Sequence, residues 1–336
     1  MNHKINTLKI LGDKIKTSLL PDIDYLARAV QLENPWFTKS NVEIALTNWA
    51  NCLTENNINL WLNNTNPTSQ KKKIGIVAAG NIPLVSLHDI LCVYVSGHEA
   101  LIKLSNQDTF LTKEILKILN SIEPETKESI QITERLNNAD ATIATGSNNS
   151  ARYFEHYFGK KPNIIRKNRT SVAIISGNET EEELKELNKD IFTYFGLGCR
   201  NVGKIYIPER YNLEILFKSI EKQTDVLEST KFMNNYDYNK AVYLLNKVKI
   251  YDTNNLIIKE SSELYSPVGC INFEYYKTKE DLHEKLRSQK NNIQCIISEN
   301  QIELNIVKFG QSQYPNLNDY ADDVNTLDFL LNLQEV

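Results

Sequence analysis

The chain has 336 residues, of which 41% are hydrophobic and 24% are charged, and its formal net charge at pH 7 is -4. This length suits two domain-sized cores, and the slightly acidic balance gives no support to nucleic acid or another polyanion as a partner. No apolar run approaches the ~20 residues of a membrane span. Because the first ten residues also lack the apolar core of a signal peptide, we expect a soluble, cytoplasmic protein.

The five cysteines are widely spaced and odd in number, and no two of them form a CxxC pair. This pattern indicates no zinc site, so we expect no bound metal, and it argues against a disulfide framework. One or more of the thiols can therefore have chemistry of its own. The cysteines are Cys52, Cys92, Cys199, Cys270 and Cys295.

Residues 1–70 are expected to be helical. One amphipathic stretch includes Leu26 to Leu32, and a second runs from Val42 to Leu62. The sequence Ser40-Asn-Val-Glu43 has the S-x-x-E pattern of a capping box, so we expect the second helix to begin there.

The periodicity changes near residue 73. Short apolar runs at 74–78, 100–104 and 141–145 predict buried strands. Pro83 is expected in the first turn of a helix that ends at Gly97, and two more helices are expected over 110–119 and after Ser147. Alternating strands and helices predict a parallel sheet with helices on its faces.

A second block begins near Thr170 with an apolar run at 172–175. Thr180 to Glu183 has a capping-box pattern and precedes a predicted helix, which Gly196 and Gly198 are suited to end. The next strand is expected at 205–207, so Cys199 lies in a helix-to-strand connection. The apolar face of the helix is expected to hold Leu184, Leu187, Ile191 and Phe195.

The first candidate for chemistry is Cys199, in Phe195-Gly-Leu-Gly-Cys-Arg-Asn201. The flanking glycines allow a substrate to approach the backbone closely, which suits a nucleophile. Alone, the segment is better explained as a small buried thiol that follows a helix end. A helix C-terminus disfavours the thiolate, so activation would have to come from Arg200, nearby N–H groups or a bound cofactor.

The second candidate is Asn81, which follows the first predicted strand, where parallel sheets bind their ligands. Its amide could donate to an oxyanion, or it could be an ordinary turn asparagine. The loop lacks the GxGxxG fingerprint of dinucleotide-binding folds. His88 lies beside the apolar face of the next helix and is expected to be a packing residue.

Three further segments are weaker signals when each is taken alone. Lys103 and Ser105 end a buried strand, where a lysine can reach a ribose or a 2′-phosphate, or can simply be a surface charge. Gly146 and Ser147 lie at a strand-to-helix junction, which is a common type of anion site. Glu263 begins the segment Glu-Leu-Tyr-Ser-Pro, which says little by itself.

In their order along the chain, these segments resemble the aldehyde dehydrogenase superfamily over roughly residues 71–275. Gly80-Asn81-Ile-Pro83 resembles its W-N-F-P segment, whose asparagine stabilises the oxyanion. Lys103-Leu-Ser105 resembles its K-x-S segment, whose lysine holds the adenosine ribose. Gly198-Cys199 resembles the G-Q-x-C segment of its nucleophile.

The other two segments fit the same superfamily. Thr145-Gly146-Ser147 is similar to its F-T-G-S turn near the cofactor phosphates, and Glu263 to Pro267 resembles E-x-F-G-P, whose glutamate orients the nicotinamide ribose. Within the superfamily, the sequence is most similar to the LuxC-type acyl-CoA reductases. The segments that carry this similarity are Asn34-Pro-Trp-Phe-Thr38, Asn81-Ile-Pro-Leu84, Tyr194 to Val202 and Gly310-Gln-Ser-Gln313.

The resemblance implies an α/β fold with a helical N-terminal region, a Rossmann-like parallel-sheet cofactor domain and an α/β catalytic domain. It implies domains at 1–168 and 169–308 and a tail, 309–336, that packs back on the cofactor domain. The implied reaction is NADPH-dependent reduction of long-chain acyl-CoA to the aldehyde through a thioacyl enzyme on Cys199, with Asn81 holding the oxyanion.

The resemblance also implies cofactor contacts from Lys103, Ser105, Gly146, Ser147 and Glu263. A homo-oligomer is expected, and a fatty-acid ligase or acyl transferase is the partner type found in such systems. Other reductases of the superfamily, of the short-chain acylating or glutamyl-phosphate type, are alternatives, as is a non-catalytic binding protein on the same fold.

One departure from the superfamily pattern sharpens the expected reaction. The E-L-G-G-K segment, with its general-base glutamate, should fall near Arg166-Lys-Asn-Arg-Thr170, and no glutamate occurs there. Oxidation of aldehydes needs that base to hydrolyse the thioacyl enzyme. Reduction of thioesters does not need it, because thiol exchange loads and unloads the acyl group.

Overall fold

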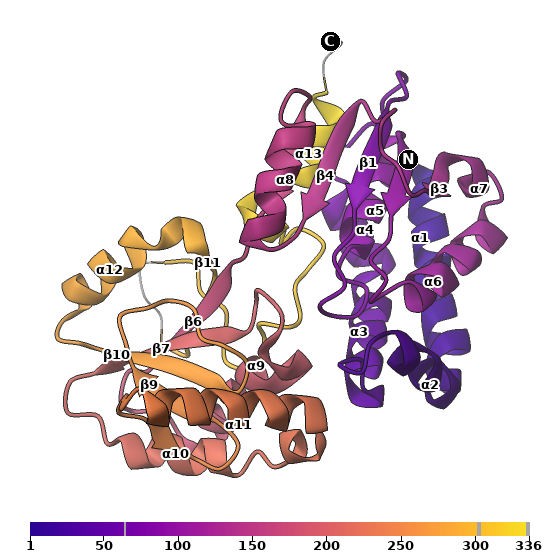
Figure 1. The fold of residues 1–336 in the computed structure, drawn as a ribbon. Helices are drawn as coiled ribbons and strands as arrows, with labels where there is room; N and C mark the ends of the chain where they lie inside the picture. Colours follow the sequence, from indigo (N-terminus) through magenta and orange to yellow (C-terminus); the bar gives the residue numbers. More distant parts are fainter. Residues whose placement is uncertain (64, 301–303, 334–336) are drawn as a thin grey trace. The chain divides into compact units, whose positions relative to one another are not determined.

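In the computed structural model the chain divides into two compact units, each with its own sheet (Figure 1). The structure describes residues 1–63, 65–300 and 304–333. Unit 1 comprises Met1–Asn168 and Asn316–Val336, and unit 2 comprises Arg169–Pro315. No helix within the described ranges has the length and apolar character needed to cross a membrane.

The N-terminal region of unit 1 is helical, as expected, but its helices begin and end at unexpected residues. The cap of α3 is Thr38, whose hydroxyl accepts from the N–H of Asn41, so the capping box expected at Ser40 is wrong. The single helix expected to reach Leu62 is broken before Thr54, which caps α4. The elements are α1 (Asn2–Lys14), η1 (Ile15–Leu19), η2 (Leu20–Asp22), α2 (Ile23–Glu33), α3 (Lys39–Cys52) and α4 (Glu55–Trp61).

The sheet of unit 1 has five parallel strands in the order β3-β2-β1-β4-β5. Three of them confirm the strands predicted from apolar runs. The two outer strands are short, and no apolar run marks them. The strands are β1 (Lys73–Val77), β2 (Glu99–Lys103), β3 (Ile130–Ile132), β4 (Ala141–Thr145) and β5 (Asn163–Arg166).

The helix after β1 ends where the sequence predicts but begins four residues later than Pro83. Leu84 has a φ of 57°, in the left-handed region, so the chain turns at this point before the helix starts at Leu87. Gly97, with a φ of 91°, ends it as predicted. The helices of this unit are α5 (Leu87–Ser96), α6 (Phe110–Ile122), α7 (Thr126–Ser129), α8 (Asn148–Phe158), η6 (Ala321–Asp323) and α13 (Thr326–Leu331).

The C-terminal segment of unit 1 is fixed against the α5 side of the unit. Helix α13 packs on α5, and its Leu330 carbonyl accepts from Nε2 of His98 at 2.9 Å. Nε2 of His88 donates to the Leu317 carbonyl at 2.9 Å, and burial lowers the pKa of this imidazole. His88 is therefore a packing residue, as predicted.

The sheet of unit 2 has six strands in the order β11-β6-β7-β10-β9-β8, all parallel except β8, which runs antiparallel to β9. The strands are β6 (Thr170–Ile174), β7 (Val202–Pro208), β8 (Tyr251–Asp252), β9 (Ile257–Glu260), β10 (Cys270–Tyr276) and β11 (Ile293–Ile297). The helices are α9 (Glu181–Phe192), η3 (Thr193–Gly196), α10 (Leu213–Glu221), η4 (Asp225–Glu228), α11 (Thr230–Leu245), α12 (Lys279–Ser288) and η5 (Lys290–Asn292).

The predicted capping box of α9 is present in full. The Thr180 hydroxyl accepts from the N–H of Glu183, and the Glu183 carboxylate accepts from the N–H of Thr180. The helix ends at Phe192, so Phe195 is not on its apolar face as expected but in the short turn that follows.

Candidate functional site

In unit 1, the carboxyl edge of the sheet carries the predicted oxyanion segment and the two predicted cofactor segments at 103–105 and 146–147. Strands β2 and β4 flank β1 and run parallel to it, so the residues that follow these three strands share one edge. The chain adds strands first on the β2 side of β1 and then on the β4 side. The edge beside β1 is therefore a topological switch point, where open α/β sheets bind ligands.

The segments after β1 and β2 are packed closely together. The Ala78 N–H donates to the Lys103 carbonyl at 3.0 Å. A Cβ built on Gly80 would lie 2.5 Å from Oγ of Ser105, so a glycine is required at this position. The structure thus brings Ser105 next to the loop that carries Asn81, while the side chains of Asn81 and Lys103 are exposed.

The turn after β4 forms a similarly close-fitting cradle. A Cβ built on Gly146 would lie 2.9 Å from the ring of Phe154 and 2.9 Å from Cβ of Ser150. Oγ of Ser147 accepts from the N–H of Ser150 and caps α8. The turn is therefore packed against the first turns of α8, and a helix N-terminus is the type of position where phosphates bind.

In unit 2, Cys199 lies in a turn directly before β7 and is half-buried. The side chain of Asn201 holds this turn, because its Oδ1 accepts from the Gly198 N–H at 2.9 Å. Its Nδ2 donates to the carbonyls of Asp190 and Thr193 at 3.0 and 2.8 Å. Oγ of Ser171 donates to the Cys199 carbonyl at 3.0 Å. The backbone of the predicted nucleophile is therefore fixed from two sides.

The residues just before Cys199 reverse the chain through an uncommon conformation. Tyr194, Phe195 and Gly196 have φ values of 54°, 57° and 75°, three successive residues in the left-handed region. Such a conformation costs about 1–2 kcal/mol per non-glycine residue, so tertiary contacts must stabilise it. Tyr194 is buried, and the ring of Phe195 lies 5.9 Å from that of Phe232.

The Gly310-Gln-Ser-Gln313 segment also supports the turn. The N–H groups of Gly310 and Ser312 donate to the buried carboxylate of Asp190 at 2.6 and 3.0 Å. Nε of Arg200 donates to the Ser312 carbonyl at 2.7 Å. The guanidinium that the sequence suggested as an activator of Cys199 is therefore bound to this segment through its Nε.

The Glu263 segment lies within the same unit, beside the start of β7. Nδ2 of Asn272 donates to the carbonyls of Glu263 and Tyr265 at 3.1 and 2.9 Å. A Cβ built on Gly203 would lie 3.6 Å from the Leu264 carbonyl oxygen. The segment therefore passes next to the strand that Cys199 precedes. The Glu263 carboxylate is exposed, 3.4 Å from Nζ of Lys259.

A buried lysine in this region was missed in the sequence. Lys204, in β7, is 1% exposed, and its Nζ donates to the Ser262 carbonyl at 2.8 Å and pairs with the Glu274 carboxylate. Burial lowers the pKa of Lys204, while Glu274 opposes that shift. Glu274 also pairs with Lys285 at 2.6 Å. A lysine within an apolar strand was the only signal in the sequence.

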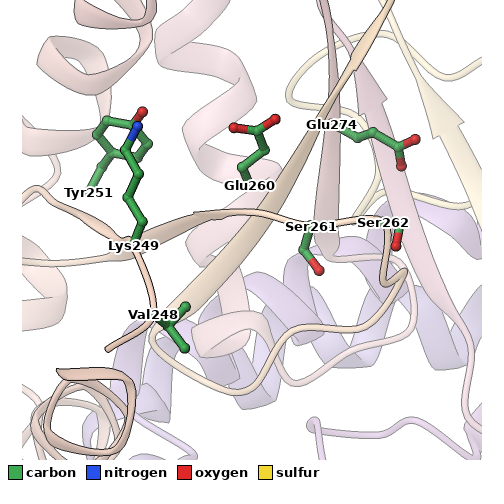
Figure 2. A pocket seen from close by; sticks show the side chains of 7 residues that line it. All are labelled: Val248, Lys249, Tyr251, Glu260, Ser261, Ser262 and Glu274. Atoms are coloured by element: carbon green, nitrogen blue, oxygen red, sulfur yellow. The ribbon is translucent and has the colours of Figure 1, made fainter. Parts of the chain in front are cut away.

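Unit 2 also has a pocket of about 450 Å³ next to this lysine, between the residues shown in Figure 2. Charged and hydroxyl side chains dominate its lining. Cys199 and Glu263 do not line it, so it adds nothing to the predicted thiol chemistry. The lining residues are Val248, Lys249, Tyr251, Glu260, Ser261, Ser262 and Glu274.

The segment 166–170, where the resemblance leads us to expect a glutamate, begins with a buried arginine. Arg166 ends β5 and forms a bidentate pair with Asp89, at 2.5 and 2.9 Å. Its Nη2 also donates to Oγ1 of Thr326 at 2.8 Å. Arg166 is thus a structural residue, and residues 166–170 include no carboxylate. No cluster of metal-binding side chains occurs in the described ranges.

No protein-family model matches the sequence. A curated relative, the long-chain acyl-protein thioester reductase of Aliivibrio fischeri, is 25% identical over 202 residues. The alignment covers 54% of this chain and 42% of that protein, so the chain matches less than half of the relative's length.

Solved aldehyde dehydrogenases share the fold. Aldehyde dehydrogenase 21 from Physcomitrella patens, in complex with succinate, superposes with a TM-score of 0.68 at 13% identity, over 97% of this chain and 84% of that chain. The NAD+ complex of an aldehyde dehydrogenase from Mycobacterium tuberculosis gives a TM-score of 0.64 at 11% identity, over 88% and 72% of the two chains. The chain therefore has an aldehyde-dehydrogenase-like α/β fold, which confirms the predicted fold class.

Proposed function

We propose that this chain is a reductase that converts acyl thioesters, long-chain acyl-CoA in particular, to aldehydes with NADPH. The observation that carries the proposal is the rigidly held turn of Cys199 before β7 in an aldehyde-dehydrogenase-like fold. Unit 1 would bind the cofactor, and unit 2 would provide the nucleophile.

The proposed chemistry begins with attack of the Cys199 thiolate on the thioester carbonyl. The C–S bond to CoA then breaks, CoA leaves as the thiolate and takes up a proton, and the acyl group remains on Cys199. The Asn81 amide and the Cys199 N–H are the proposed oxyanion donors, and losing one such donor typically costs about 2.7–4 kcal/mol. Addition of a hydride to the thioacyl carbon and cleavage of its C–S bond release the aldehyde and regenerate the Cys199 thiolate.

A bound nicotinamide cofactor would supply the hydride for that reduction. Lys103 and Ser105 would hold its adenosine ribose, Gly146 and Ser147 its phosphates, and Glu263 the nicotinamide ribose. The packing of Gly80 against Ser105 supports this assignment, because it holds the oxyanion segment and one of the proposed cofactor segments together at the carboxyl edge of the sheet.

The preference for NADPH rests on the missing carboxylate at the end of β2. Folds that prefer NAD commonly place an acidic residue there, on the ribose 2′-hydroxyl. Here Lys103 ends the strand, and the first acidic residue after it is Asp108. The Asp108 carboxyl is buried and accepts from the Leu84 N–H, so it is not directed at a ribose.

The lack of a carboxylate in residues 166–170 supports reduction rather than aldehyde oxidation. Hydrolysis of a thioacyl enzyme needs a general base, and residues 166–170 include no carboxylate that could act as one. A thiol can instead load and unload the acyl group without such a base. The name of the Aliivibrio fischeri relative agrees with thioester chemistry.

We propose a homo-oligomer in the cytoplasm that receives its acyl groups from a fatty-acid ligase or acyl transferase.

Acyl labelling tests the nucleophile directly. A radiolabelled acyl-CoA should label the wild-type enzyme, and Cys199→Ser should abolish the label. Cys52→Ser is the matched control, since Cys52 is also half-buried, and it should label normally. Persistent labelling of Cys199→Ser would show that another residue is the nucleophile. A coupled assay with NADPH and NADH over a series of acyl-CoAs would then measure the cofactor and chain-length preferences.

A further inference from the structure

The geometry points to Asn34 and Asp108 as positioning residues that hold the Asn81 loop in its oxyanion-binding shape. The inference rests on the proposed function, because the two buried side chains affect the reaction only by holding the loop of Asn81, the proposed oxyanion donor. Neither residue is expected to touch the substrate or the cofactor.

Asn34 fixes the peptide group that precedes Asn81. It follows α2, is 2% exposed, and donates from Nδ2 to the Gly80 carbonyl at 3.1 Å. Its Oδ1 accepts from the N–H of Trp36 at 3.1 Å, so the amide is held at both ends. Because a peptide group is planar, fixing the Gly80 carbonyl also fixes the direction of the Asn81 N–H.

Asp108 fixes the loop on the other side of Asn81. It lies between β2 and α6, is 4% exposed, and accepts from the Leu84 N–H through Oδ2 at 2.8 Å. Leu84 is left-handed, with a φ of 57°, which is unfavourable for a leucine. The hydrogen bond to Asp108 helps to hold this turn three residues after Asn81.

The chemistry of Asp108 is costly for a residue that only stabilises the fold. Oδ1 is buried and makes no hydrogen bond of standard geometry among the described residues, although the Thr112 side chain interacts with the carboxyl and lowers its pKa. Burial raises the pKa of this carboxyl to about 8, and the charge of Glu33 adds to the shift. A neutral carboxyl still accepts from Leu84 through its carbonyl oxygen, and an asparagine amide can do the same.

The two hydrogen bonds together enclose Asn81. They come from different segments, one before α3 and one before α6, and they act on residues 80 and 84. A third bond, from the Ala79 N–H to Oγ of Ser86 at 3.1 Å, closes the base of the same loop. These bonds hold the backbone that carries Asn81, and a preorganised oxyanion donor requires a backbone held in place.

The test is a double-mutant cycle on the acylation of Cys199 in the full-length enzyme. Single-turnover labelling by acyl-CoA would be measured for Asn34→Ala, Asp108→Ala and Asn81→Ala, and for each of the first two combined with the third. We expect Asn34→Ala and Asp108→Ala each to slow acylation roughly 10-fold or more. Neither should exceed the ~10²–10³-fold decrease expected when the oxyanion donor itself is removed in Asn81→Ala. In the Asn81→Ala background, neither change should slow acylation further.

Two more measurements separate positioning from general destabilisation. Asp108→Asn should acylate at the wild-type rate, because it keeps the acceptor for Leu84. Hydrogen exchange in Asn34→Ala should rise in residues 79–86 and stay at the wild-type level in β1. Thr126→Val is the control for loss of a buried polar side chain elsewhere in unit 1, and it should leave acylation unchanged.

The outcomes distinguish this inference from the proposed function. A wild-type enzyme that acyl-CoA does not label on Cys199 overturns the proposed function, and the inference falls with it. Normal labelling of Cys199 overturns the inference alone if Asn81→Ala acylates at the wild-type rate. The inference alone is also overturned if Asn34→Ala or Asp108→Ala slows acylation by the same factor with Asn81→Ala as without it. Acylation of Asp108→Asn as slow as that of Asp108→Ala would overturn it too.

Discussion

A single buried carboxyl, Asp108, should make the stability of this protein depend on pH. Burial raises its pKa from 3.8 to about 8, so the folded protein holds the proton more tightly than the unfolded chain. Its stabilising contribution is complete below pH 3.8 and is lost as the pH rises towards 8. Asp108→Asn cannot ionise. The difference between its thermal midpoint and that of the wild type should therefore increase in favour of the variant as the pH rises through this window. Thermal unfolding below, within and above the window measures the difference, and a constant difference would contradict the prediction.

Lys103 provides a second prediction at the same scale. Lys103→Glu places a carboxylate at the end of β2, where it would repel a 2′-phosphate and accept from a 2′-hydroxyl. The ratio of kcat/KM for NADPH to that for NADH should therefore fall at least ~10-fold. Lys113→Glu, an exposed change of the same charge on α6, is the control and should leave the ratio unchanged.

Helix α9, which leads to the Cys199 turn, depends on its cap. Thr180→Ala removes one half of the capping box and should lower the free energy of unfolding by about 1 kcal/mol. Lys185→Ala changes an exposed residue of the same helix and should stay within about 0.5 kcal/mol of the wild type. Denaturant unfolding measures both. Equal stabilities for the two variants would show that the cap contributes nothing.

The left-handed residues at 84, 194 and 195 explain why two helices are shorter than their sequence patterns. The apolar periodicity of α5 begins already at Leu84, before the helix starts. The apolar periodicity of α9 continues to Phe195, after the helix has ended. In both places the helix stops short of the pattern, because distant contacts hold the backbone in a turn. Asp108 binds the Leu84 N–H, and Phe232 packs against Phe195. None of these three turning positions is a glycine, so the sequence does not reveal the change.

At the scale of the whole molecule, the chain's last segment completes unit 1. Arg166 donates to Thr326, and Nε1 of Trp61 donates to the Tyr320 hydroxyl at 2.8 Å. Leu317, Leu327 and Leu330 are each buried in the same core, and burying one leucine stabilises a fold by roughly 1.5–3 kcal/mol. A chain that ends at Pro315 should therefore unfold at much lower denaturant concentration than the full chain.

The matched control for that truncation is Val324→Ala, because Val324 is 39% exposed and its loss should be nearly neutral. A truncated chain with the wild-type midpoint would show that unit 1 folds without this segment.

The sequence by itself determined the elements that local physics controls. Apolar runs predicted the central strands of the first sheet. Thr180 and Glu183 predicted the capping box of α9, and Gly97 predicted the end of α5. The order of Asn81, Lys103, Cys199 and Glu263 along the chain led to the fold class, which the solved structures confirm, and to a site that stays a prediction.

Only the tertiary structure decided which partners these residues have. The hydrogen bond of Asp108 to Leu84 spans 24 residues, that of Asn34 to Gly80 spans 46, and the pair of Lys204 and Glu274 spans 70. None of these separations corresponds to a local pattern, because the partners meet only once the strands between them have paired. The sequence therefore named the candidate loop and the candidate thiol, and the fold decided what holds each of them in place.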